Sequence, residues 1–97
     1  MDTRKPISPS NVIDDLYSNE LNSLLDELFK KITLKEYDHE ISSAYIVITV
    51  KNNNYNNVVL NEVKRRYLKE GWGNIFYKPL GDVITFQLYF PQIKSVI

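Results

Sequence analysis

The residues best suited to chemistry are few, and the first to consider is a lone histidine. His39 is the only histidine in the chain and stands between two carboxylates, Asp38 and Glu40. Flanking carboxylates can orient an imidazole that acts as a general base. Catalysis would also need a nucleophile or a second histidine, and the sequence offers no cysteine, no metal-binding cluster and no glycine-rich loop to accompany it. We therefore expect residues 38–40 to form a polar loop, and we predict a non-enzymatic protein with no catalytic residue, metal site or cofactor.

The second group able to do chemistry is a basic cluster in the second half of the chain. The cluster consists of Lys64, Arg65, Arg66 and Lys69. On a helix these cations could follow a phosphate backbone while Tyr45 and Tyr89 stack on bases. Solvated helix faces have the same composition, and the formal net charge of the chain is zero, whereas nucleic-acid-binding domains are usually basic. Nucleic-acid binding is therefore an alternative function and not the first prediction.

The zero net charge conceals an uneven distribution of charge along the chain. Residues 12–40 contain eight acidic and three basic side chains, a net charge of −5, whereas residues 51–78 contain six basic and two acidic ones, a net charge of +4. A basic partner could bind the first region, and a phosphate backbone could bind the second.

The elements that position these residues are clearest near the C-terminus. Residues 83–90 alternate in side-chain character with a period of two, which predicts a strand ended by Pro91. Residues 74–78 form a second, short strand, and Pro-Leu-Gly-Asp at 79–82 supplies the turn between them. We therefore predict a β-hairpin.

The start of this hairpin follows a Gly-Trp-Gly sequence. Gly71 stands where a glycine would close the preceding helix. Trp72 follows directly, and we expect its ring to fold back over the helix end as part of the core; an exposed binding anchor is the alternative.

The N-terminal half predicts one long helix and one strong strand. Helical spacing of apolar residues and the Ser8-Pro9 start predict a helix over 9–32, with a possible break near Ser18-Asn19. Residues 44–51 alternate as a strand, and an asparagine-rich turn leads into a helix over 55–70.

These elements predict an α+β fold in the order α-β-α-β-β. A right-handed crossover makes strands 44–51 and 74–78 parallel, and the most apolar strand, 83–90, is placed between them and antiparallel to both. Both helices would cover one face of this three-stranded sheet. We expect residues 1–8 to be a flexible arm and 9–97 a single domain.

The other face of the predicted sheet is left uncovered. Its expected residues are Tyr45, Val47, Thr49, Val83, Thr85, Gln87 and Tyr89, with Phe76 or Tyr77 from the short strand. This set is more apolar and aromatic than a solvated face requires, and such patches usually mark interfaces. A sheet face that is simply half-exposed is the alternative. The predicted protein-interaction residues are Tyr45, Val47, Thr49, Thr85, Gln87 and Tyr89.

The C-terminal half also resembles small uncharacterised phage proteins. The resemblance lies in a helix ending Tyr67-x-x-x-Gly71-Trp72, then a strand, a turn and Val83-Ile84-Thr85-Phe86. It covers the last half of the chain and carries no catalytic signature. What it implies is an accessory protein of the host-takeover or anti-defence type, an inhibitor that acts by stoichiometric binding.

The predicted function is therefore stoichiometric binding of a host or viral protein, through the uncovered sheet face or the acidic first helix, with a homodimer as a further possibility. The alternatives are nucleic-acid binding and a nucleotide-sequestering sponge whose pocket lies between subunits. The polar N-terminus is unlike a secretory signal, and no apolar run reaches the roughly 20 residues of a membrane span. We thus expect a cytoplasmic protein, in the host cytoplasm if phage-encoded, without membrane contact.

Overall fold

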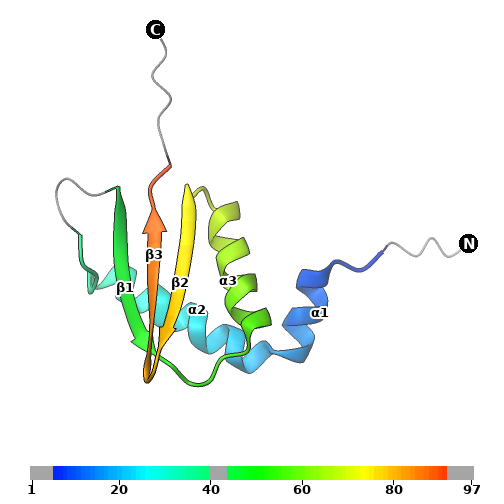
Figure 1. Ribbon diagram of the computed structural model, residues 1–97. Coiled ribbons are helices and arrows are strands. Elements are labelled where there is room, and N and C mark those ends of the chain that lie inside the picture. The colour runs from blue at the N-terminus through cyan, green and yellow to red at the C-terminus, as the bar shows by residue number, and fades with distance from the viewer. Residues whose placement is uncertain (1–5, 40–43, 92–97) are drawn as a thin grey trace, which may run out of the picture.

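A computed structural model describes residues 6–39 and 44–91 and has two layers, a sheet and the helices packed on it (Figure 1). The elements are α1 (Pro9–Leu16), α2 (Ser18–Thr33), β1 (Tyr45–Lys51), α3 (Asn57–Lys69), β2 (Asn74–Leu80) and β3 (Val83–Tyr89). The predicted α+β class and element order are confirmed, with the first helix divided into two pieces. Most of the predicted flexible arm lies outside the described residues.

The first helical region bends at Tyr17. Ser8 caps α1 by accepting a hydrogen bond from the Asn11 backbone N–H at 3.3 Å, and Pro9 occupies the first turn. At Tyr17 the backbone leaves the helical region, with φ −126° and ψ 29°, and α2 begins at the next residue. The bend turns α1 away from the strands, so that it lies on the far side of α3 from the sheet (Figure 1). The predicted break is confirmed, one residue earlier than the pattern suggested.

The sheet has the predicted order β1-β3-β2, and β3 is antiparallel to both neighbours. β1 and β2 are therefore parallel to each other and joined through α3, as a crossover connection requires. An asparagine run forms the start of that crossover: Asn54 adopts a positive φ of 57°, and the Asn56 side chain accepts from the Val58 N–H at 2.9 Å. Both are conformations and contacts that asparagine favours.

The hairpin turn is shorter than the sequence predicted. β2 continues through Pro79 and Leu80, which pair with Ile84 and Val83, so only Gly81 and Asp82 form the turn. Gly81 has φ 62°, the positive value that a tight two-residue turn requires at its first position. The prediction of a turn over 79–82 was wrong because β2 is an edge strand, where a proline that cannot donate a hydrogen bond is tolerated.

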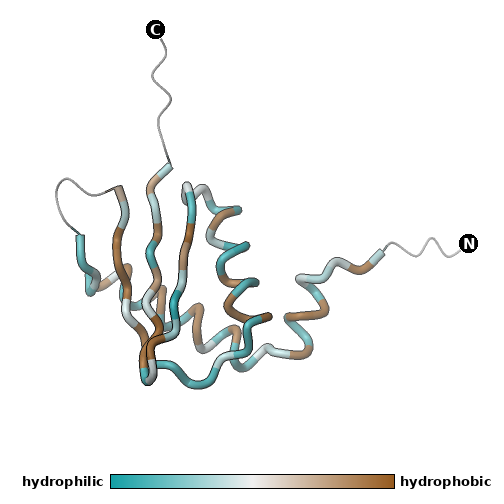
Figure 2. The backbone as a smooth tube through the Cα atoms, in the orientation of Figure 1, coloured by the Kyte–Doolittle hydropathy of each residue, from teal (hydrophilic) through white to brown (hydrophobic). Residues whose placement is uncertain are grey.

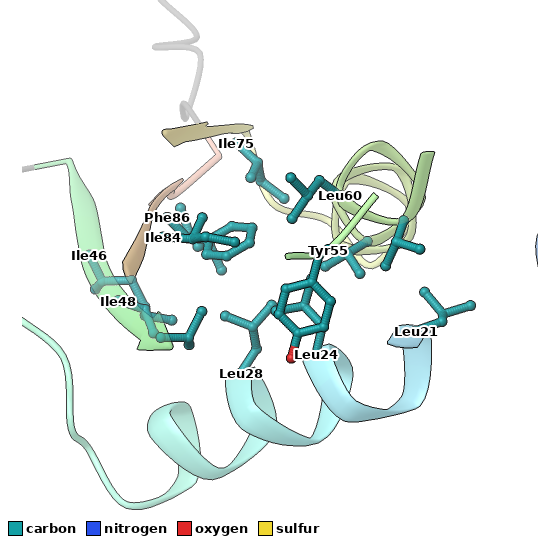
Figure 3. Close-up of a cluster of buried hydrophobic side chains, with 14 residues drawn as sticks. Leu21, Leu24, Leu28, Ile46, Ile48, Tyr55, Leu60, Ile75, Ile84 and Phe86 are labelled. Atoms are coloured by element: carbon teal, nitrogen blue, oxygen red, sulfur yellow. The ribbon is translucent and has the colours of Figure 1, made fainter. Parts of the chain in front are cut away.

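A single hydrophobic core fills the space between the helices and the sheet (Figure 3). Leu21, Leu24 and Leu28 of α2 are fully buried and meet the even-numbered side chains of β1 and β3, including the largest, Phe86. Figure 2 shows the same division along the chain: hydrophobic stretches follow the strands, and the helices alternate between hydrophobic and hydrophilic residues. Because these contacts come from one side of the sheet, no helix of residues 6–39 and 44–91 covers the opposite face.

Both glycines that flank Trp72 have a structural reason. Gly71 has φ 112°, which allows two hydrogen bonds that close α3 as a Schellman motif. The Trp72 N–H donates to the Tyr67 carbonyl at 3.4 Å, and the Gly71 N–H donates to the Leu68 carbonyl at 3.1 Å. A Cβ on Gly73 would lie 2.5 Å from the Phe90 carbonyl oxygen. The Trp72 ring packs against the core and stacks on Phe90 with centroids 5.6 Å apart, as expected for a side chain that covers the helix end.

In the described ranges, no helix is both long enough and apolar enough to cross a membrane.

Candidate protein-binding face

The sheet face that carries no helix, called here the open face, is built from alternate residues of all three strands. It comprises Tyr45, Val47, Thr49 and Lys51 of β1, Asn74, Phe76, Lys78 and Leu80 of β2, and Val83, Thr85, Gln87 and Tyr89 of β3. None of these twelve residues is buried, whereas the even-numbered residues of β1 and β3 between them are. The strand period of two thus divides the sheet cleanly into a packed side and an open side.

The structure brings together all six residues that the sequence predicted as an interaction surface. The register pairs Tyr45 with Tyr89, Val47 with Gln87 and Thr49 with Thr85. Phe76 joins them from β2 as the partner of Gln87. Tyr77 points to the other side, where its hydroxyl donates to the side-chain oxygen of Asn61 on α3. The choice between Phe76 and Tyr77 is therefore resolved in favour of Phe76.

Aromatic side chains gather at one end of the open face. The Tyr45 and Tyr89 rings have centroids 4.6 Å apart, and Phe76 meets Tyr89 edge-on at 5.6 Å. Phe76 remains 49% exposed despite these contacts. Tyrosines with an apolar ring and a polar tip are enriched at protein interfaces, because they bury large areas without leaving a polar group unpaired.

A shallow hollow of about 480 Å³ lies beside this aromatic group, over the β2–β3 hairpin. It is lined by Phe76, Tyr77, Lys78 and Leu80 of β2 and by Thr85 and Gln87 of β3. Leu80 is 52% exposed here. A hollow lined by an exposed leucine and an exposed phenylalanine could receive an apolar side chain from another molecule.

The β2 edge of the sheet is poorly suited to pairing with another strand. The backbone N–H of Ile75 donates to the Asn74 side chain at 2.8 Å. Pro79, four residues further along the strand, has no N–H. A β-strand that is added to a sheet needs such donors. On the other edge, Val47 of β1 exchanges two 2.9 Å hydrogen bonds with Asp38. The face of the sheet is therefore a better candidate interface than either of its edges.

The basic cluster predicted as a phosphate-binding surface is divided between two sides of α3. The Lys64 ammonium lies 5.7 Å from the centroid of the Phe76 ring, at the β2 rim of the open face. Arg65 and Arg66 instead donate to Glu62 of the same helix, which also accepts from Ser10 of α1. The exposed Lys69 lines a cleft between the helices together with Arg65 and Arg66, and the acidic Asp14 and Glu70 line the same cleft. The four cations thus do not form one continuous surface.

Glu62 is the hub of a polar network that the sequence did not reveal in full. Its side chain is 2% exposed and accepts from Ser10 at 2.6 Å, from Arg65 at 2.9 and 2.8 Å, and from Arg66 at 2.7 Å. The Arg65 hydrogen bond is the main cause of a Glu62 pKa lowered from 4.5 to about 2, with burial opposing it. Arg66 also reaches Asp14 of α1 at 2.7 Å. The contacts of this network with Ser10 and Asp14 join residues 52 positions apart.

His39 shows no catalytic arrangement in the described part of the chain. Its ring meets the edge of Phe90 with centroids 5.8 Å apart, and the described residues contain no group of three or more histidine, cysteine or acidic side chains able to hold a metal ion. Asp38 uses its backbone to bridge β1, which the sequence did not predict, and Glu40 lies outside the described residues.

No protein-family model matches this chain, and no curated protein or solved structure matches it either. The open face is therefore the feature from which function must be inferred.

Proposed function

We propose that this protein acts without catalysis, by binding another protein in fixed stoichiometry through its open face. The observation that carries the proposal is the set of twelve unburied side chains on one sheet face, which includes Phe76, Leu80 and two tyrosines in mutual contact. A sheet face that only meets water is normally polar, because the alternating pattern places its apolar residues in the core. Here the outward row keeps apolar and aromatic groups that gain stability by being covered.

The resemblance to small phage proteins supports a host or viral protein as the partner. Such a partner would be inhibited or redirected by being bound, and the protein would then act in the cytoplasm of the infected cell. The charge of the open face adds a constraint: Lys51 and Lys78 stand on it and Lys64 at its rim. A partner surface with acidic groups around an apolar centre would complement this arrangement.

The size of the open face limits the binding affinity to be expected. Three strands about 4.8 Å apart, each of seven residues at about 3.4 Å, give a flat patch of roughly 340 Å². Side chains that project from the sheet increase the area that a partner can bury, but stable complexes usually bury about 800 Å² on each side. Tight binding would therefore depend on a few anchors, and Phe76 and Leu80 are the most exposed apolar side chains on the face.

The proposal is tested by comparing two exposed phenylalanines on opposite sides of the molecule. Phe76 lies on the open face at 49% exposure, and Phe29 lies on α2 at 65% exposure. Replacing either by glutamate introduces the same charge and removes the same ring. The tagged wild-type protein and the two variants would be used to capture proteins from a bacterial lysate, with the molar ratio of each captured protein measured by quantitative mass spectrometry.

We expect Phe76→Glu to abolish capture of a stoichiometric partner and Phe29→Glu to leave it unchanged. Both variants should melt close to the wild-type temperature, since neither ring belongs to the buried core. Equal loss with the two variants, or capture that survives Phe76→Glu, would contradict the assignment of the open face.

Single-stranded nucleic acid is a second candidate, favoured by the Tyr45–Tyr89 pair together with the three lysines on the open face and its rim. Arg65 and Arg66 count against it, because Glu62 already satisfies much of their hydrogen-bonding capacity. A salt titration of oligonucleotide binding separates the two functions. Phosphate contacts would make the affinity fall steeply with salt, whereas an affinity independent of salt would exclude this second function.

A further inference from the structure

Opposite charges stand on the two rims of the open face, at the same level of the sheet. One row of paired residues crosses the whole sheet at this level. Asp38 pairs with Val47 of β1, and Val47 pairs with Gln87 of β3. Gln87 pairs in turn with Phe76 of β2, and the Lys64 ammonium lies over the Phe76 ring. Because directly paired residues in an antiparallel ladder point to the same side, the Asp38 side chain belongs to the open face. The row therefore has an exposed carboxylate at the β1 rim, neutral groups at its centre and an ammonium at the β2 rim.

This row decides how two copies of the face could meet. In a symmetric dimer the same patch faces itself, and the two-fold axis lies in the plane between the two sheets. An axis parallel to β3 places β1 of each copy over β2 of the other, so that Asp38 approaches Lys64 of the other copy, twice. An axis across the strands at this level would place Asp38 over Asp38 and Lys64 over Lys64. Only the first arrangement matches opposite charges.

The dimensions of the sheet are compatible with this first arrangement. Packed sheets lie about 10 Å apart and are rotated by about 30°. At two strand spacings from β3, about 10 Å, this rotation moves the two rims past each other by roughly 5 Å, a distance that the four-carbon stem of lysine can span. Lys51 and Lys78 of different copies would be diagonal neighbours, but both stand toward the hairpin end, where their ammonium groups can reach water.

We propose that the open face is self-complementary: two copies form a dimer about an axis parallel to β3, with Asp38 of each facing Lys64 of the other. This inference rests on the proposed function, in which the open face is an interface, and adds a second copy as its first occupant. The flat area of the face is small compared with that of a stable dimer. The dimer is therefore weak and dissociates on dilution. Another protein can bind the open face only after the dimer has dissociated.

A charge-exchange experiment tests the arrangement. Sedimentation equilibrium at low ionic strength, where screening is weak, would measure the dimer dissociation constant of the wild type, Asp38→Lys, Lys64→Glu and the double variant. Each single change replaces two attractive contacts by two repulsive ones, and we expect it to weaken the dimer about 30-fold. The double variant restores both pairs with their signs exchanged, and it should return to within about threefold of the wild type.

Matched controls separate the rim contacts from a change in total charge. Asp26→Lys on α2 and Lys69→Glu on α3 make the same charge changes at exposed positions away from the open face. We expect both controls to dimerise like the wild type. Circular dichroism of every variant would verify the fold, and the double variant serves as a second check because it contains both substitutions.

Three results would overturn the inference: a wild type that stays monomeric at millimolar concentration, single variants no weaker than their controls, or a double variant as weak as the single ones. The proposed function is judged separately, by the capture experiment with Phe76→Glu. If the charge exchange fails but another protein is captured in a Phe76-dependent manner, self-association is refuted and the proposed function stands. If the double variant restores the dimer but no partner protein is captured, the proposed function is refuted and the dimer stands.

Discussion

Replacing Glu62 by glutamine should destabilise the protein at neutral pH, and the effect should disappear in acid. Glutamine keeps the shape of the side chain but removes the charge to which Ser10, Arg65 and Arg66 donate. Two arginines would then face an uncharged amide in a buried position, where loss of one partner of a charge pair is costly. α1 would be the element most affected, because it has no buried residue and Ser10 is one of its few ties to α3.

The magnitude follows from the lowered pKa. A fall from 4.5 to about 2 corresponds to about 3 kcal/mol of stability if it is fully expressed. The Arg65 side chain is 50% exposed, so solvent screening reduces the expected contribution to about 1–2 kcal/mol. Since the pKa is lower in the folded state, this stability is present above pH 4.5 and is lost as the pH falls toward 2.

Urea unfolding of the wild type and Glu62→Gln at pH 7, 4.5 and 2.5 measures this directly. The difference in unfolding free energy should be about 1–2 kcal/mol at pH 7, similar at pH 4.5 and much smaller at pH 2.5. Comparing two variants at each pH cancels the effect of the other carboxylates. A difference that stays constant from pH 7 to pH 2.5, or a glutamine variant more stable than the wild type at pH 7, would refute the assigned role of Glu62.

Three further substitutions test the fold. Gly73→Ala should cost about 2 kcal/mol in urea unfolding, because its methyl group would lie 2.5 Å from the Phe90 carbonyl oxygen and force a backbone shift; an unchanged midpoint would show that this contact is wrong. Leu24→Ala should cost about 2–5 kcal/mol, since Leu24 is fully buried between α2 and the sheet; a loss below about 1 kcal/mol would place it outside the core. Leu80→Ala, at 52% exposure on the open face, should change the unfolding free energy by less than about 0.5 kcal/mol at dilute concentration; a loss as large as that of Leu24 would mean that the monomer covers this face.

The sheet was predictable because its strands carry local information. In β1 and β3 the alternation of side chains identifies both the strand and the face that each residue joins, and this was enough to collect Tyr45, Val47 and Gln87 on one surface. The end of α3 was predictable for a similar reason, because Gly71 provides a positive φ that few other residues adopt. These features depend on a few consecutive residues and need no knowledge of the remaining chain.

The features that the sequence did not reveal depend on distant contacts. The sequence predicted a break near Ser18-Asn19 but not the direction in which α1 turns, because α1 is held in place by contacts of Ser10 and Asp14 with Glu62 and Arg66, 52 residues further along the chain. Asp38 stands in a polar stretch with no strand pattern, and only the β1 backbone recruits it. The length of β2 was underestimated because Pro79 signals a turn in isolation but is tolerated on an edge strand.

Whether the open face is the binding surface is best tested by photocrosslinking inside the cell that produces the protein. A photoreactive phenylalanine analogue would replace Phe76 in one variant and Phe29 in another, so that both probes start from exposed aromatic positions. We expect one dominant crosslinked product from position 76, either twice the mass of the chain or its mass plus that of one other protein, and no such product from position 29. Efficient crosslinking from position 29 with none from position 76 would contradict it.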